Sequence, residues 1–341
     1  MGNNFINNLS LVREKHGRQI LAILKLLILV ILSIFAFMNF DSKLFFNSIH
    51  ALPFQNILYY LSFIFLSKLL YAFRWKINGK VVFPKVKISL FEYFQYNVLA
   101  EFISIVMPTS IGGEITRILK IRQKNVKTSY ATASILIDRA LGIIGMALVS
   151  ICALLLLGKR MTFSLKNILP DTLLLPIILG ILVIFVIVMF LFLHWVRQPR
   201  QTKRLSRAWD IIRDKFGIIL ISLGISIVGH LVFSLAHSFL FVELYPLSWL
   251  ETIAIILTPQ LARSIPISVL GISAGEGLMV ASQMMAGMPR ETALIITIIS
   301  LFGRYFFAFL GFLLEFLKDG VSFFKQVKEN KHEILEDEAD R

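Results

Sequence analysis

The sequence predicts an all-α polytopic membrane protein with six full transmembrane helices and two oppositely oriented re-entrant helical hairpins. Of its 341 residues, 57% are hydrophobic and only 16% are charged, whereas soluble domains have roughly 25% charged residues. Long apolar runs recur along the chain, and basic residues gather between them. Two of these runs contain proline, glycine and glutamate, a combination that is unusual in a spanning helix.

The first apolar run, residues 20–38, is predicted to be a retained span that places residues 1–19 in the cytoplasm. It shows no small-residue cleavage site of the kind that ends a signal peptide. Residues 56–73 form the second span, and Lys68 is expected to extend toward its cytoplasmic end. The next loop is assigned to the cytoplasm by its basic residues, which are Arg74, Lys76, Lys80, Lys85 and Lys87.

Residues 89–107 are apolar apart from interruptions such as Glu92 and Glu101, and they end at MPTSIGGE. A second basic cluster follows, consisting of Arg117, Lys120, Arg122, Lys124 and Lys127. Because basic loops flank this segment on both sides, the positive-inside rule predicts that it enters from the cytoplasm and returns there. The hairpin is expected to break at Pro108 and at Gly112–Gly113.

Residues 128–157 are predicted to cross outward, and residues 172–195 to cross back. The loop between them violates the rule mildly, with Lys159, Arg160 and Lys166, whereas the loop after residue 195 is strongly basic. Residues 217–242 then cross outward, toward a loop that has two glutamates and no lysine or arginine.

The second hairpin is expected within residues 250–289, which contain PISVLGISAGEGL at 266–278. The last span, 292–317, leads into a charged cytoplasmic tail, 318–341, so the second hairpin must open to the outside. Residues 20–317 thus form one transmembrane domain, in which the halves 56–157 and 217–317 share the order span, hairpin, span. This arrangement predicts an inverted repeat, as in transporters that alternate access to a central site.

Each span that follows a hairpin carries one arginine near its middle, Arg139 in the first half and Arg304 in the second. An arginine at that depth costs at least about 2.5 kcal/mol unless it faces protein or water. Two interpretations stay open: contact with an anionic ligand, or a structural ion pair. The carboxylates available for a pair are Glu114, Asp138 and Glu276.

The half-helices expected to begin near Gly112 and Gly275 would present free N–H groups, which suit a phosphate. A structural alternative exists for each feature. Ser273 and Glu276 match a capping box, and the glycines permit close helix packing. The candidate substrate-binding residues are Gly112, Gly113, Glu114, Arg117, Arg139, Arg263, Gly275, Glu276 and Arg304.

The sequence carries no catalytic or cofactor motif, so neither an enzyme nor a cofactor is expected. Cys152 is the only cysteine, and His230 and His237 lie seven residues apart, which does not suit a zinc pair. Basic residues do not alternate with aromatic ones on an exposed face, so the net charge of +14 is assigned to topology and anionic lipid rather than to nucleic acid.

Three segments resemble the transmembrane domain family of lysylphosphatidylglycerol synthases, whose stand-alone members are often called flippase-like proteins. They are MPTSIGGEITR (107–117), ILIDRALGI (135–143) and SIPISVLGISAGEGL (264–278), and the resemblance extends from about residue 15 to 320. In full-length synthases this domain is implicated in moving aminoacylated phosphatidylglycerol between leaflets, and a separate soluble domain transfers the lysyl group. The short tail here is too small for that soluble domain, so the resemblance implies the translocating part without the synthase.

These features together predict a transporter in the inner (cytoplasmic) membrane that moves an anionic, phosphate-containing lipid between leaflets. The lipid would be a phospholipid or a polyprenyl-phosphate-linked lipid, and an oligomer is compatible with the sequence. Two alternatives are a non-catalytic accessory protein of an envelope lipid or glycan pathway and, less favoured, a lipid-modifying enzyme. The enzyme would use Glu114 or Glu276 as general base and would need a second reactive group nearby.

Overall fold

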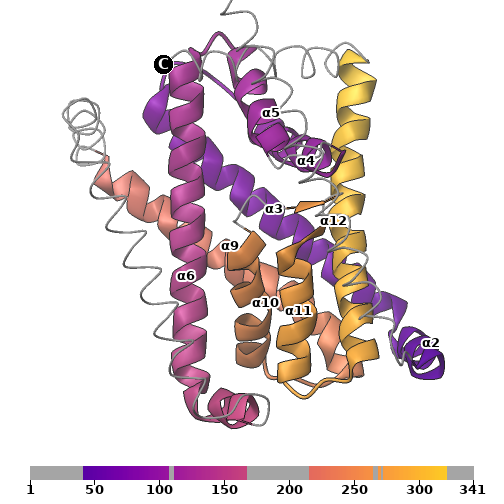
Figure 1. Cartoon of the computed structure of the whole chain (residues 1–341). Helices are drawn as coiled ribbons and strands as arrows, with labels where there is room; N and C mark the ends of the chain where they lie inside the picture. Colours follow the sequence, from indigo (N-terminus) through magenta and orange to yellow (C-terminus); the bar gives the residue numbers. More distant parts are fainter. Residues whose placement is uncertain (1–40, 107–110, 167–214, 264–267, 270–271, 321–341) are drawn as a thin grey trace, which may run out of the picture.

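The computed structural model describes residues 41–106, 111–166, 215–263, 268–269 and 272–320 (Figure 1). Four described helices are long and apolar enough to cross a membrane. They are α3 (Phe54–Val82), α6 (Thr128–Lys166), α9 (Phe216–Leu244) and α12 (Arg290–Asp319). Two of the six predicted spans, residues 20–38 and 172–195, lie outside the described residues, as do Pro108 and Pro266.

Helix α3 continues well past the predicted end of the second span, residue 73. Its last part is polar, yet Arg74, Trp75 and Asn78 are buried against neighbouring helices. The prediction that Arg74 lies in a cytoplasmic loop was therefore wrong. A short helix that the sequence did not predict, α2 (Ser42–Ala51), precedes α3; the carboxylate of Asp41 caps its start by accepting hydrogen bonds from two backbone N–H groups.

Two pairs of shorter helices form the hairpins: α4 (Leu90–Val106) with α5 (Ile111–Arg122), and α10 (Trp249–Arg263) with α11 (Ala274–Met285). The first helix of each pair begins at a capping box. At α4, the backbone N–H of Ser89 donates to the Glu92 carboxylate at 2.8 Å, and the backbone N–H of Glu92 donates to the Ser89 hydroxyl at 3.1 Å. At α10, the backbone N–H of Ser248 donates to the Glu251 carboxylate at 2.8 Å, and the backbone N–H of Glu251 donates to the Ser248 hydroxyl at 3.3 Å. The same local signal thus starts both hairpins.

The second hairpin contains a helix-interior proline and a small strand pair. Pro259 has no N–H, so the carbonyl of Ile255 loses its helical donor, and the hydroxyl of Ser282 on α11 donates to that carbonyl at 3.0 Å. Between the helices, β1 (Ser268–Val269) pairs antiparallel with β2 (Ile272–Ser273). These short strands lie inside the segment that the sequence predicted to be the non-helical turn of the hairpin.

The glycines of the first hairpin do not lie where the sequence placed the break. Gly112 and Gly113 belong to the first turn of α5, because that helix begins at Ile111. A Cβ atom at Gly113 would lie 2.7 Å from the carbonyl oxygen of Ala100, so this glycine permits close packing of α5 on α4. In the second hairpin, a Cβ atom at Gly277 would meet nothing within 4 Å, and close packing does not explain that residue.

The two halves have the same helix order and similar packing. Helices α3 and α9, each 29 residues long, pack on each other. The first helix of each hairpin packs on the last helix of the other half, α4 on α12 and α10 on α6, and the second packs on the last helix of its own half. Figure 1 shows the α4–α5 and α10–α11 pairs toward opposite ends of α6 and α12.

Candidate functional site

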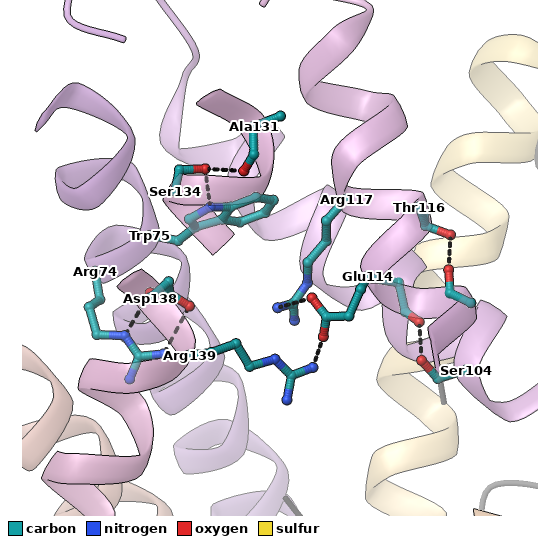
Figure 2. A network of polar contacts seen from close by, with 12 residues as sticks. Arg74, Trp75, Ser104, Glu114, Thr116, Arg117, Ala131, Ser134, Asp138 and Arg139 are labelled. Carbon is teal, nitrogen blue, oxygen red and sulfur yellow. Dashed lines mark hydrogen bonds and ion pairs between the residues drawn. The ribbon is translucent and has the colours of Figure 1, made fainter. Parts of the chain in front are cut away.

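In the first half, two guanidinium groups approach one carboxylate (Figure 2). Glu114 lies in the first turn of α5 and forms an ion pair with Arg139 of α6 through Oε1. Its other oxygen, Oε2, lies 3.9 Å from Nη1 of Arg117, one helical turn further along α5. The Arg139 side chain remains 49% exposed, so this pair is accessible.

Arg117 is held from behind by an aromatic ring. Its guanidinium carbon lies 5.4 Å from the centroid of the Trp75 ring, within the range of a cation–π contact. Trp75 is completely buried, and its indole nitrogen lies 3.5 Å from the hydroxyl of Ser134 on α6. The ring therefore provides a fixed surface under Arg117.

In the second half, Glu276 lies in the first turn of α11 and accepts a hydrogen bond from Arg304 of α12 at 3.2 Å. This is the same relation of hairpin glutamate to span arginine as in the first half. Glu276 is buried, whereas the side chain of Glu114 is 27% exposed. The capping-box alternative for Glu276 depends on Ser273, which immediately precedes α11 but whose side chain lies outside the described part.

A carboxylate of the first hairpin also reaches the second half's arginine. Oε1 of Glu101 on α4 lies 3.7 Å from Nε of Arg304, and Oε2 accepts a hydrogen bond from Lys68 at 2.6 Å. Lys68 therefore points into the protein, and the expectation that it extends to the cytoplasmic interface was wrong. The sequence did contain a signal for this contact, because Glu101 is an ionisable side chain inside the otherwise apolar segment 89–107.

Asp138, a candidate partner of Arg139 by sequence, pairs instead with Arg74. The Nε and Nη2 atoms of Arg74 donate to its two oxygens at 2.8 and 3.0 Å. Asn78 of α3 donates to the same carboxylate at 3.2 Å, and Arg74 also donates to Ser226 of α9 at 2.9 Å. The sequence did not predict this buried network.

Another buried ion pair joins α5 to α12. Lys120 and Glu315 contact each other with side chains that are 1% and 0% exposed, and Gln95 of α4 donates to Glu315 at 3.2 Å. Arg74 and Lys120 were both counted as cytoplasmic loop charges, yet both are buried inside the protein. Only the basic residues that remain in each cluster therefore support the predicted cytoplasmic loops.

Other charges of the second cluster lie nearer the surface. Lys124, which follows α5, donates to Glu92 at 2.5 Å. Partial burial raises the pKa of Glu92, but the hydrogen bonds from Lys124 and from the backbone and hydroxyl of Ser89 outweigh this effect, so the pKa lies below its ordinary value.

The remaining candidates take the following places. Gly112 and Gly275 are buried in the first turns of α5 and α11, and the Gly112 carbonyl accepts from Thr116 at 2.8 Å. Arg263 ends α10, and its side chain lies outside the described part. His230 contacts Tyr71 and the carbonyl of Gly142. No group of three or more potential metal-ligating side chains occurs within the described ranges.

Both arginines lie far from their helix starts. Arg139 is 11 residues after Thr128 and Arg304 is 14 after Arg290. At about 1.5 Å per residue these positions are roughly 17 and 21 Å along their helices, in the middle part of a core about 30 Å thick.

The described cluster combines five basic with four acidic side chains, which are Lys68, Arg74, Arg117, Arg139 and Arg304 with Glu101, Glu114, Asp138 and Glu276. It therefore has one excess positive charge.

The family model for the lysylphosphatidylglycerol synthase TM region matches residues 22–311. The chain belongs to this family. As a member of the lysylphosphatidylglycerol synthase TM region family with four apolar helices of spanning length, it is a multi-pass membrane protein connected with lipid pathways. The matched region includes every residue of the charged cluster. No curated protein and no solved structure matches the chain.

Proposed function

We propose that this protein binds the phosphate-containing headgroup of an anionic lipid and moves the lipid between leaflets. The supporting observation is the pair of arginines, Arg117 and Arg139, that share the single carboxylate of Glu114. Asp138 does not neutralise the second arginine, because Arg74 and Asn78 already occupy its oxygens. One positive charge is thus left for an anion, and the exposure of Arg139 gives the anion access.

Binding proceeds by exchange of partners in this proposal. A phosphate approaches Arg139, takes over the hydrogen bond that the guanidinium gives to Glu114, and is also attracted by Arg117. The planar guanidinium can donate hydrogen bonds to two phosphate oxygens at once, a bidentate geometry that a lysine amine does not provide. The acyl chains stay in the bilayer, since only the headgroup needs a polar path. Glu114 holds the arginine in the absence of lipid and avoids an unpaired charge at membrane depth.

Translocation requires a second, related site, and Arg304 with Glu276 and Glu101 is the candidate. We propose that the α4–α5 and α10–α11 hairpins enter the membrane from opposite faces, as in an inverted repeat. The repeated helix order and the reciprocal packing of α4 on α12 and α10 on α6 support this view. The headgroup then passes from one arginine to the other as access alternates.

The proposal is tested in proteoliposomes by leaflet-resolved assay of headgroup-labelled lipids, with phosphatidylglycerol as the anionic and phosphatidylcholine as the zwitterionic probe. Arg139→Gln and Arg304→Gln should each slow phosphatidylglycerol movement roughly ten- to hundredfold, the effect of losing a charged hydrogen bond worth about 1.5–3 kcal/mol. Lysine at either position should retain part of the activity. Arg122→Gln is the matched control, because Arg122 is exposed at the end of the same hairpin.

Normal transport by the Arg139→Gln/Arg304→Gln double variant would refute the proposal. One observation favours a second candidate, a non-catalytic accessory role in a lipid pathway: Glu114 and Glu276 each pair with the arginine of their own half, so the charges also serve the fold. That role predicts that variants in which these charged residues are replaced by neutral ones, and which fold normally, move lipid at an unchanged rate. Only the pathway would be impaired.

A further inference from the structure

The Arg74–Asp138 pair is the most completely bonded charged group of the described cluster. Both side chains are buried, at 8% and 7% exposure, and two parallel hydrogen bonds join them. Ser226 accepts from the remaining Arg74 nitrogen, and Ser222 donates to Asn78 at 2.8 Å. The pair therefore ties α6 to α3 and α9 at one height.

The packing around the pair fixes this height on α6. A Cβ atom at Gly142, one turn after Asp138, would lie 3.0 Å from two nitrogens of the Arg74 guanidinium, so glycine leaves the room that the guanidinium occupies. The carbonyl of Gly142 also lies 3.1 Å from Nε2 of His230 on α9. Residues 138–142 of α6 are thus held from two sides.

We propose that Arg74 is a positioning residue for Arg139. Asp138 and Arg139 are neighbours on one helix, so their side chains leave the axis about 100° apart. While Arg74 holds Asp138 toward α3, Arg139 is left to extend toward α5 and Glu114, as Figure 2 shows. This inference rests on the proposed function for its meaning in transport, because it concerns the arginine that receives the headgroup.

The physical reason is competition for a buried charge. A carboxylate that loses its only cation in a low-dielectric site is strongly destabilised and recruits another cation within reach. In an Arg74→Ala variant the cations within reach of Asp138 are Arg139, the next residue in the chain, and Arg117, which the charge of Asp138 also attracts. Arg139 then turns from Glu114 to Asp138 and no longer presents its guanidinium to a headgroup.

The decisive comparison is between Arg74→Ala and Arg74→Ala/Asp138→Ala. For each, the binding of phosphatidylglycerol vesicles by the purified full chain is measured, and phosphatidylcholine vesicles give the background. The single variant should bind about tenfold more weakly, the effect of one lost charged contact. The double variant should recover to within about threefold of the original chain, because no competing carboxylate remains. If the Arg74–Asp138 pair were only structural, the double variant would bind phosphatidylglycerol vesicles no more tightly than the single variant.

A readout that does not depend on lipid separates this idea from the proposed function. Glu114→Gln and Arg139→Gln are combined in a double-mutant cycle of melting temperatures, which measures the coupling between the two side chains. The coupling should be present in the original chain, lost with Arg74→Ala, and restored with Arg74→Ala/Asp138→Ala. Where Arg74→Ala does not fold, Arg74→Gln takes its place, because it retains a polar side chain with N–H donors but removes the charge.

Unchanged coupling in the Arg74→Ala or Arg74→Gln background would overturn the positioning role, whatever the lipid assay gives. If the cycle behaves as expected but no variant changes vesicle binding, the positioning role stands and the proposed function fails. If the double variant loses both binding and coupling, Arg74 and Asp138 hold the fold together and do not direct Arg139.

Discussion

Removing the cation of the Lys120–Glu315 pair tests how much a buried charge network holds the first hairpin in place. The perturbation is Lys120→Met, which keeps most of the side-chain volume and removes the charge. The Lys120 and Glu315 side chains are 1% and 0% exposed, so no solvent compensates the carboxylate that remains. Breaking a buried pair from one side costs about 3–5 kcal/mol, and this is the expected loss in the free energy of unfolding.

The matched control is Lys124→Met, because Lys124 lies four residues further along and is also paired with a glutamate, Glu92 of α4. Lys124 and Glu92 are 34% and 23% exposed, and such a pair contributes about 0–1 kcal/mol. The double variant Lys120→Met/Glu315→Met should be more stable than Lys120→Met alone, because no uncompensated charge is left. It should still lose about 1–3 kcal/mol, since the Gln95 amide no longer has its acceptor.

The assay is denaturant unfolding in detergent micelles, followed by far-ultraviolet circular dichroism, for the original chain and the three variants. The loss in the free energy of unfolding should be larger for Lys120→Met than for Lys124→Met by at least about 2 kcal/mol. Equal losses in the two single variants would show that the pair is hydrated, and would refute the argument from burial.

Two further predictions concern the carboxylates and the topology. Glu114 and Glu276 hold the arginines that the headgroup must take over, so Glu114→Gln and Glu276→Gln should change the rate of lipid movement, measured in proteoliposomes. Wild-type rates in both variants would leave only a structural role for these glutamates. Single cysteines at Ser110 and Ser273, in a Cys152→Ser background, should be labelled by an impermeant maleimide from the cytoplasmic and the outer side respectively. Labelling of both from one side would exclude opposed hairpins.

Local patterns in the sequence predicted several features that the described residues confirm. Apolar length located the helices α3, α6, α9 and α12, and the two interrupted runs coincide with the helix pairs α4–α5 and α10–α11. The idea that a hairpin glutamate pairs with a span arginine was among the open interpretations, and each half contains such a pair. The helices depend on residues close in sequence or on composition alone, which the chain displays directly, whereas the two glutamate–arginine pairs join residues 25 and 28 apart and needed the folded chain to select them.

Only the tertiary structure decided which charges are neutralised. Arg74 and Asp138 are 64 residues apart, and Lys120 and Glu315 are 195 apart, so no local spacing connects either pair. The positive-inside rule counts basic residues by position and cannot tell a loop lysine from one buried against a distant helix. A charge near the end of an apolar run can face water or a partner, and the packing of α3, α5, α6 and α12 determines which. The free energy of a buried charge depends on whether its partner lies within a few ångströms, and the folded chain alone sets that distance.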